Sequence, residues 1–282
     1  MATAPHTYRK RDRIREHLLD LMEGLAPGDA VPSERRLCAE LEVSRPTLRS
    51  VVDELVRDGL LVRRQGQGMF VAEPKIAQAL TQQARGVAAT GIGTHAVAGV
   101  TGNWTSRTVD FTRISAGARV GRRLRLAPSA PVLRATRLRL VDGEPISVET
   151  LHLPEALVPG LTAEDLADHS FYALLESRYG IGVHDALQTI EPTVTDEEEA
   201  ALLGVPQHFP ALLFERVTED EQGRVVEFSH SVYRGDRYRI VSRLSLARND
   251  SGGRMLAGQW STADPTEQGR GLPADPFFAT PS

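Results

Sequence analysis

The sequence predicts an α+β protein made of a small helical N-terminal domain and a larger strand-rich second domain. Up to residue 58, apolar residues recur at three- and four-residue steps, which is the spacing of amphipathic helices. Between residues 106 and 247, apolar and polar residues alternate in short runs bounded by turn residues, which is the pattern of half-buried strands. A chain of 282 residues is long enough for two such domains.

Composition sets the boundaries of these domains. Residues 73–105 are rich in Ala, Gly and Thr, which is typical of a linker, and we expect a short helix at 75–85 within it. The last segment, 248–282, is rich in Gly, Pro and Ser and is expected to be disordered. We therefore expect a first domain over 1–72 and a second over 106–247, with two amphipathic helices among the strands of the second.

Charge and cysteine content exclude several classes of protein. The net charge is −4, and residues 1–72 hold 12 Arg and Lys against 11 Asp and Glu, so binding to a polyanion requires basic side chains gathered on one face. The only cysteine, Cys38, cannot form an intramolecular disulfide, which favours a reducing compartment. Neither a signal peptide nor a run of about 18 apolar residues is present, so we expect a cytoplasmic protein that does not enter a membrane.

Three helices are predicted in the first domain. An amphipathic helix over 8–24 ends before "APGD". Ser33 is the expected N-cap of a second helix. Ser44 caps a third, in which Pro46 in the first turn costs no hydrogen bond and Gly59 follows the last turn. Two short capped helices separated by the tight turn "LEVS" predict a helix-turn-helix.

The apolar stripe of the third helix leaves three polar side chains on the solvent side of its first turns: Arg45, Thr47 and Arg49. A helix enters the major groove of DNA with its first turns toward the base edges, where arginine pairs with guanine and threonine meets a phosphate or a thymine methyl group. Ser33 and the free amides that follow it can bind a phosphate.

A hairpin follows, because "LLVRRQGQGMFV" predicts two strands around a turn at Gly66–Gly68. Glycines let this tip approach a minor groove closely, with Arg63, Arg64 and Gln65 beside it. Taken singly, exposed arginines usually form a solvated face, and Gly-x-Gly usually satisfies only turn geometry. The complete order of helix, two capped helices and arginine–glycine hairpin favours DNA binding.

The stretch "PSERRLCAELEVSRPTLRSVVDELVRDGLLVRRQGQGMFV" resembles the N-terminal winged-helix domain of the GntR family of bacterial transcription regulators. Over about residues 8–72, "PSER", "L-x-V-S-R-x-T-x-R", "L-x-x-x-G-L" and "R-x-G-x-G-x-F-V" occur in the family's order and spacing. The resemblance implies that a homodimer binds a palindromic operator in double-stranded DNA, with Gly66 at the wing tip entering the minor groove. The operator contacts that it implies are Arg35, Ser44, Arg45, Thr47 and Arg49. Met69 stands where threonine is common, and we expect little effect because it lies past the tip.

In the second domain, "PVLRATRLRLVDGEPISVETLHL" alternates through a turn at Asp142–Gly143. Arg137 and Arg139 share one parity and therefore one face of a strand. A two-residue turn would place Glu149 on the other face. A three-residue loop with a left-handed Gly143 would pair residue 137 with residue 149 and place Glu149 on the arginine face. The second register is our hypothesis.

A later strand, within "RVVEFSHSVYRGD", pairs an apolar face with a polar one, as in a sheet that lines a polar cavity. The polar parity consists of Glu227, Ser229, Ser231 and Tyr233. "DHSFYALLESRYGI" predicts a helix capped by Ser170, whose hydroxyl and open amides can bind a phosphate or carboxylate, with Tyr172 near the mouth of the cavity. From periodicity alone, surface ion pairs explain the charged strand residues equally well.

These segments resemble the UTRA sensor domain of the HutC subfamily over about residues 106–246. "R-x-R-x-x-x-G-E-P-I-x-x-E-x-x-x-x-P", "S-F-Y-A-L-L-E-x-x-Y-G" and "E-x-S-x-x-x-Y" follow in the family's order. The resemblance implies a chorismate-lyase-like α/β domain with a mainly antiparallel sheet and a pocket for a small effector. It implies an anion site formed by Arg137, Arg139, Ser170 and Tyr172. It also implies that hydroxyls or an amine are held by Glu149, Glu227 and Tyr233.

One departure from the family concerns the ligand. Many members carry an "L-x-S-F-T-E"-like segment at the entry to this domain, whereas this chain has "GIGTHAVAGVTGNW", with Thr94, His95 and Thr101 as weak substitutes. The identity of the ligand therefore stays open, and a ligand other than the phosphorylated sugar common in the subfamily is an alternative.

The sequence thus predicts a transcriptional regulator, most simply a repressor, controlled by a small polar or anionic metabolite such as a phosphosugar or an amino sugar. We expect no cofactor, no metal, no catalytic residue and no enzymatic activity. The only cysteine lies in the first domain, and the histidines are scattered rather than spaced as ligands or as a triad. Two alternatives remain open: a degenerate sensor domain, and residual lyase-type activity in that domain.

Overall fold

The computed structural model of the chain describes residues 6–79, 103–166 and 171–241. Ser170, the linker after residue 79 with its weak anion-site candidates, and the tail expected over 248–282 lie outside the described residues.

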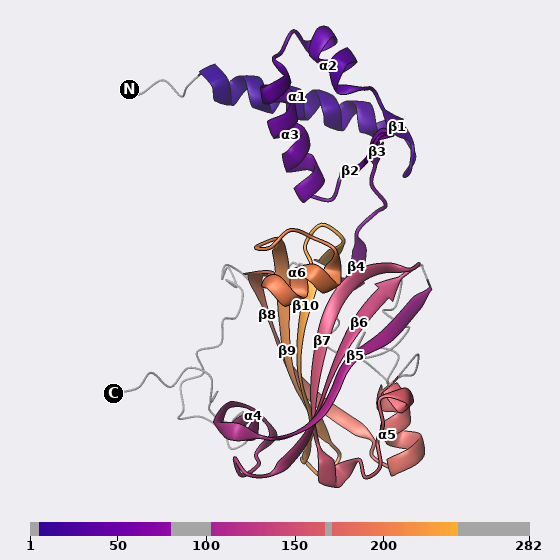
Figure 1. Ribbon diagram of the computed structural model, residues 1–282, viewed down its shortest axis with the longest axis vertical. Helices are drawn as coiled ribbons and strands as arrows, with labels where there is room; N and C mark the ends of the chain where they lie inside the picture. The colour runs from indigo at the N-terminus through magenta and orange to yellow at the C-terminus, as the bar shows by residue number, and fades with distance from the viewer. Residues whose placement is uncertain (1–5, 80–102, 167–170, 242–282) are drawn as a thin grey trace, which may run out of the picture. The chain divides into compact units, whose positions relative to one another are not determined.

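The N-terminal part combines three helices with a three-stranded antiparallel sheet (Figure 1). Its elements are α1 (His6–Glu23), β1 (Ala30–Val31), α2 (Glu34–Leu41), α3 (Arg45–Arg57), β2 (Leu61–Arg64) and β3 (Gly68–Val71). One apolar cluster, with Leu18, Leu37 and Leu55 fully buried, joins the helices to the sheet. The three predicted helices and the hairpin are confirmed. The short strand β1, which pairs with β3, has no counterpart in the sequence prediction because two residues are too few to show a period.

Both predicted helix caps are present. The Ser33 and Ser44 side chains accept hydrogen bonds from the backbone N–H groups of Arg36 and Thr47, each at 3.4 Å. Pro46 lies in the first turn of α3. The stripe of α3 is buried as expected, at Leu48, Val51, Val52 and Leu55. Burial of this stripe fixes the rotation of α3 and directs its polar side toward solvent.

The C-terminal part is built on a six-stranded sheet in which all neighbouring strands are antiparallel. Its strands, in spatial order, are β5 (Trp104–Ser115), β6 (Pro131–Val141), β7 (Glu144–Pro154), β10 (Val225–Arg234), β9 (Pro210–Asp220) and β8 (Val183–Val194). The α+β class predicted from the sequence is therefore confirmed.

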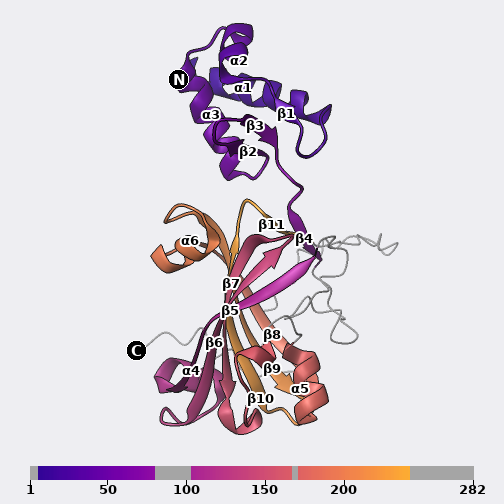
Figure 2. The same cartoon turned by 45° about the vertical axis from the view of Figure 1, so that its right-hand side comes forward.

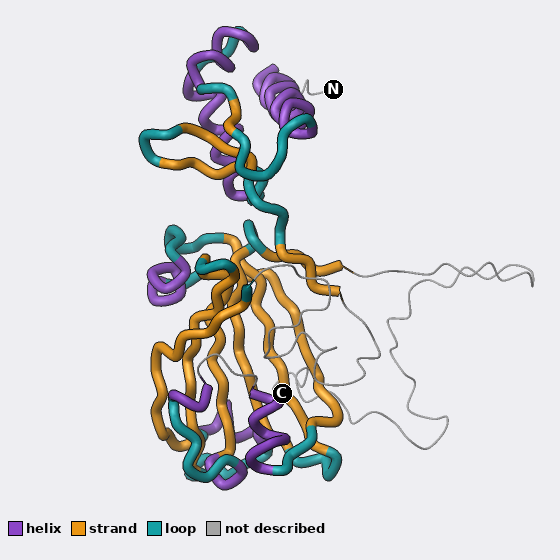
Figure 3. The backbone as a smooth tube through the Cα atoms, turned by 90° about the vertical axis from the view of Figure 1, so that its right-hand side faces the viewer, coloured by secondary structure: helices purple, strands orange, loops and turns teal. Residues whose placement is uncertain are grey.

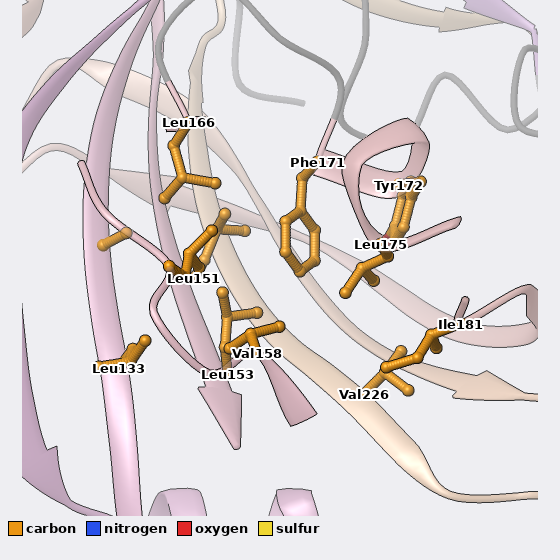
Figure 4. Packing of buried hydrophobic residues seen from close by; sticks show 12 residues of the cluster. Leu133, Leu151, Leu153, Val158, Leu166, Phe171, Tyr172, Leu175, Ile181 and Val226 are labelled. Carbon is orange, nitrogen blue, oxygen red and sulfur yellow. The ribbon is translucent and has the colours of Figure 1, made fainter. Parts of the chain in front are cut away.

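Helices cover both faces of this sheet (Figures 1 and 2). α4 (Gly117–Leu124) and α6 (Glu197–Leu203) pack on one face, here called the outer face. α5 (Phe171–Tyr179) packs on the other, here called the inner face, where Phe171 and Leu175 meet Leu151 and Leu153 in the largest apolar cluster (Figure 4). Two single 3₁₀ turns precede α5. The prediction of two helices in this part is wrong, because its described residues form three, and α4 and α6 span only eight and seven residues, fewer than the window over which helical periodicity is judged.

A separate pair of short strands closes the C-terminal part. β4 (Ile76–Ala79) and β11 (Tyr238–Val241) run parallel, side by side (Figure 3). The helix expected at 75–85 is wrong where the chain is described. Buried Gln78 accepts a hydrogen bond from the Tyr238 hydroxyl, so pairing with a distant strand overrides the helical preference of this alanine-rich segment.

Candidate functional site

The first turns of α3 present polar side chains to solvent, opposite its buried stripe. Arg45 and Arg49 are exposed there, and Arg35 is exposed in the first turn of α2. The Thr47 hydroxyl lies 2.8 Å from the Ser44 hydroxyl, so both are held at the cap. The two helix starts therefore offer hydroxyls and guanidinium groups, which suit phosphate oxygens and base edges.

Glu34, which sequence reasoning did not assign to the interface, binds two arginines of this surface. Arg49 donates from Nε to Glu34 Oε2 at 2.8 Å, and Arg63 Nη2 lies 3.5 Å from Oε1. Arg63 also pairs with Asp53. The hydrogen bond to Glu34 raises the pKa of Arg49. Glu34 and Arg49 stand 15 residues apart on different helices, so no spacing within a helix indicates their contact.

The turn between β2 and β3 forms the wing tip. Gly66 has a φ of 72°, in the left-handed region that favours glycine, and a Cβ added there would meet no atom within 4 Å. Gln65 is exposed beside it. The Arg64 guanidinium carbon lies 4.5 Å from the centroid of the Phe70 ring, a cation–π contact that holds the side chain along the hairpin. The tip is small and open, as close approach to a groove requires.

The second site begins with the register of β6 and β7. Asp142 and Gly143, with φ of 50° and 83°, form a two-residue turn, yet Arg137 pairs with Glu149. A bulge between Arg139 and Leu140 in the ladder adds one residue to β7 and shifts the pairing by one. The expected pairing is thus confirmed, whereas the three-residue loop offered to explain it is wrong.

Arg137 and Glu149 form a buried ion pair on the inner face. Arg137 Nε donates to Glu149 Oε2 at 3.0 Å, Nη2 donates to the same oxygen, and Nη1 donates to the backbone oxygen of Leu166. Arg139 Nη1 lies 3.6 Å from the same carboxylate. Burial by itself would raise the pKa of Glu149, but Arg137 and Arg139 outweigh it and lower the pKa to about 2. Glu149 is therefore an anion that orients two guanidinium groups.

A second buried carboxylate, Glu227, lies beneath α5. It accepts hydrogen bonds from the Tyr172 hydroxyl and, at 3.2 Å, from the Thr218 hydroxyl, and Arg216 Nη2 lies 3.5 Å away. Tyr172 is 2% exposed, so its expected place at the mouth of a cavity is wrong. Burial raises the pKa of Tyr172 well above its usual value, which keeps the phenol a donor to Glu227.

The polar parity predicted for β10 does lie on one face. Ser231 and Tyr233 stand opposite Glu149 and Ser147 in the ladder, and therefore on the arginine side. Tyr233 packs against Tyr238, with ring centroids 4.3 Å apart. The structure thus gathers six of the seven predicted effector residues on the inner face, and the seventh, Ser170, lies outside the described residues.

Sequence reasoning missed two members of this cluster. Arg216, 8% exposed, stands on β9 opposite Ser229, and Trp104, 5% exposed, stands on β5 opposite Val141. The alternation of "PALLFERVTED" held the signal for Arg216, because its parity matches the buried face of β9. The cluster contains three guanidinium groups and two carboxylates, and therefore has one excess formal positive charge. Its members are Arg137, Arg139, Arg216, Glu149 and Glu227.

Two further features bear on function. Among the residues that the structure describes, no three His, Cys, Asp or Glu side chains gather as a metal site would require. None of the described helices has the length and apolar character needed to cross a bilayer.

Two family models match the chain. "Bacterial regulatory proteins, gntR family" matches residues 10–71, and "UTRA domain" matches residues 101–239. These ranges contain, respectively, the capped helices with the wing and the six-stranded sheet with its buried charges.

Named relatives share both parts. The HTH-type transcriptional repressor NagR of Bacillus subtilis is 33% identical over 225 residues, which cover 77% of this chain and 86% of that protein. The HTH-type transcriptional repressor PhnF of Mycolicibacterium smegmatis is 35% identical over 228 residues, covering 81% and 89%. The histidine utilization repressor of Pseudomonas putida is 30% identical over 224 residues, covering 78% and 84%.

The crystal structure of PhnF from Mycobacterium smegmatis is similar to this chain, with a TM-score of 0.54 at 32% identity over 83% of this chain and 100% of that one. The regulators of this family bind DNA operators and small-molecule effectors. With both models matched in order and repressors among its relatives, the chain belongs to the GntR family of bacterial regulatory proteins and, through its UTRA domain, to the HutC subfamily.

Proposed function

We propose that this chain represses transcription from a palindromic operator, and that a small polar or anionic metabolite, such as a phosphosugar or an amino sugar, lowers its affinity for that operator. The observation that carries the proposal is the buried cluster of three arginines and two glutamates on the inner face. Replacing such a cluster by apolar side chains often costs a fold nothing, so stability alone gives little reason to keep it. A ligand site does.

The proposed operator contacts come from the two helix starts and the wing. They are Ser33, Arg35, Ser44, Arg45, Thr47 and Arg49, with Arg64, Gln65 and Gly66 at the minor groove. The exposure of all of them except half-buried Thr47, and the N-caps that orient α2 and α3, support this assignment. We further propose a cytoplasmic homodimer, because a two-fold axis matches two half-sites of a palindrome.

The proposed effector contacts come from the sheet and α5. They are Arg137, Arg139, Glu149, Ser170, Tyr172, Glu227 and Tyr233. Within this set, Arg137 and Tyr172 bind Glu149 and Glu227, so their main role is to orient the two carboxylates. The proposal requires neither cofactor nor catalysis, and turnover of a bound metabolite by the full chain would contradict it.

Operator binding tests the proposal directly. Fluorescence anisotropy with the DNA upstream of the chain's own gene should give sequence-dependent binding that weakens as salt rises, because phosphate contacts release counterions. Unrelated DNA of the same length is the control. Sedimentation should show a dimer with two half-sites occupied. Equal affinity for both DNAs, or a monomer at full occupancy, would contradict the proposal.

A screen for the metabolite tests the sensor. Phosphosugars, amino sugars and amino acids are compared by thermal shift, because a ligand of the folded state raises the melting temperature by mass action. The compound that does so should also release the operator DNA. A compound that stabilises the chain without changing operator affinity would argue against control by that ligand.

A further inference from the structure

Three N–H donors on the inner face have no hydrogen-bond partner among the described residues. They are Nε1 of Trp104, Nε of Arg139 and Nε of Arg216. Their residues are 5%, 6% and 8% exposed, so bulk water does not reach these atoms. Buried N–H groups are nearly always paired, and three unmet donors on one face therefore call for an explanation.

The sheet brings these donors to the same region. The Arg139 guanidinium carbon lies 5.6 Å from the centroid of the Trp104 ring. Arg139 and Arg216 both lie within electrostatic reach of Glu149 and of Tyr233. The Tyr233 phenol lies in turn beside the Ser147 hydroxyl. Donors from three strands thus border one part of the inner face.

Apart from the Ser147 hydroxyl, which can donate or accept, the unmet side-chain groups described on this face are N–H donors. No buried carboxylate or amide oxygen of the described side chains lacks a partner. The surrounding cluster also carries one excess positive charge, since three guanidinium groups face two carboxylates. A neutral hydroxyl can accept the free hydrogen bonds, but an anion both accepts them and compensates the charge.

We propose that the inner face holds an anion subsite between Arg139 and Arg216, and that this subsite takes the phosphate or carboxylate group of a small metabolite. The Trp104 N–H donates to the same group, and the Tyr233 phenol borders it. The inference rests on the proposed function, because it assumes that the UTRA domain of this chain binds an effector.

This subsite differs from the anion site that the family resemblance implies. That site combines Arg137 and Arg139 with Ser170 and Tyr172. Here the Arg137 guanidinium already binds Glu149 and the Leu166 backbone oxygen, and the Tyr172 hydroxyl already binds Glu227. In the proposed subsite, Arg216 replaces Arg137 as the second cation beside Arg139, and its charge makes the subsite select an anionic ligand.

The fluorescence of Trp104 provides a direct readout. The chain has two tryptophans, Trp104 and Trp260, so the full chain carrying Trp260→Phe reports from Trp104 alone. The anionic probes are inorganic phosphate, glucose 6-phosphate and glucuronate. Glucose and glucosamine serve as neutral and cationic probes of matched size. We expect a saturable change of Trp104 emission with at least one anion, at a Kd of about 1 mM or tighter, and none with glucose or glucosamine.

Charge-removing variants locate the subsite. Arg139→Met and Arg216→Met should each weaken the anion at least about tenfold, whereas Arg216→Lys, which keeps the charge, should weaken it less. Arg134→Met is the matched control, because Arg134 is half-buried on the outer face and its Nε also lacks a partner. Its anion affinity should equal that of the parent chain. Circular dichroism and melting curves identify any variant that fails to fold, in which case Arg216→Lys carries the test.

Two kinds of result overturn the subsite. One is unchanged anion affinity in Arg216→Met, or a preference for glucose or glucosamine over the acids. The other is a Trp104 emission that no anion alters up to about 50 mM. Either result leaves operator binding intact and so leaves repression standing. Loss of sequence-dependent operator binding in the parent chain would count against the proposed function instead.

Discussion

Arg137 and Glu149 stand opposite each other across β6 and β7, although the two-residue turn that joins these strands would by itself place them on opposite faces. One bulged residue in β7 makes the difference. The bulge moves a carboxylate from the outer face of the sheet to the inner one, and the buried charge cluster depends on it.

Loss of Arg137 should therefore damage the fold more than the ligand site. Arg137→Met leaves Glu149 charged and buried, and we expect the free energy of unfolding to fall by about 3–5 kcal/mol. Adding Glu149→Gln should restore much of that loss, because it removes the buried carboxylate that Arg137→Met leaves with Arg139 as its remaining ion-pair partner. Urea unfolding of the parent, both single variants and the double variant measures the coupling. Simple additivity of the two single losses would show that the pair does not act as a unit.

Stability should fall in mildly acidic solution because of His152. This side chain stacks on Phe228, with ring centroids 5.6 Å apart, and burial lowers its pKa from 6.5 to about 4. The unfolded chain then binds a proton that the folded chain does not, so the free energy of unfolding declines as the pH falls from 6.5 to 4. His152→Phe, which keeps the stacking, should flatten that decline in urea titrations at several pH values.

Below pH 4, the parent chain and the His152→Phe variant should lose stability to the same extent. The pKa of Glu149 is lowered from 4.5 to about 2, so its ion pair stabilises the fold above pH 4.5 and is lost as the pH falls toward 2. A His152→Phe chain with the parent's slope between pH 6.5 and 4 would assign the decline to other groups.

Removing the Glu34 charge should strengthen operator binding. Glu34 binds Arg49 and Arg63, and Glu34→Gln frees the Arg49 guanidinium for DNA and leaves Arg63 paired with Asp53 alone. Ion pairs this exposed contribute at most about 1 kcal/mol, so the expected gain is about two- to fivefold, with a steeper salt dependence. Glu40→Gln is the control, because Glu40 lies on the same helix but pairs with Arg36 and His17. Equal gains in both variants would reduce the effect to net charge.

Loss of either exposed arginine at the start of α3 should weaken operator binding without changing effector binding. Arg45→Ala and Arg49→Ala should each weaken specific binding by about 1–3 kcal/mol, as for loss of one arginine–guanine contact. The thermal shift produced by the effector should stay unchanged. Arg57→Ala, exposed at the other end of α3, is the control and should keep its affinity. Loss of the effector's thermal shift in the Arg45 or Arg49 variant would contradict the division of labour between the two parts.

Local patterns predicted the N-terminal part well and the inner face only partly. Caps at Ser33 and Ser44 and the stripe of α3 depend on neighbouring residues, and these are confirmed. The contact of Glu34 with Arg49 joins two different helices, and the contact of Arg216 with Glu227 depends on the register of β9 and β10, and one sequence shows neither. Tyr172 illustrates the same limit, because its helix was predicted while its burial depends on β9 and β10.

The pairing of β4 with β11 determines where an expressed fragment of the sensor should begin and end. The family match runs from 101 to 239, so a fragment with those ends would lack β4 altogether and would end inside β11. Gln78 would be missing as a partner for the Tyr238 hydroxyl, and the apolar cluster around Trp104 and Phe214 would lose Ile76. A fragment that keeps the sensor whole starts before Ile76 and ends after Val241.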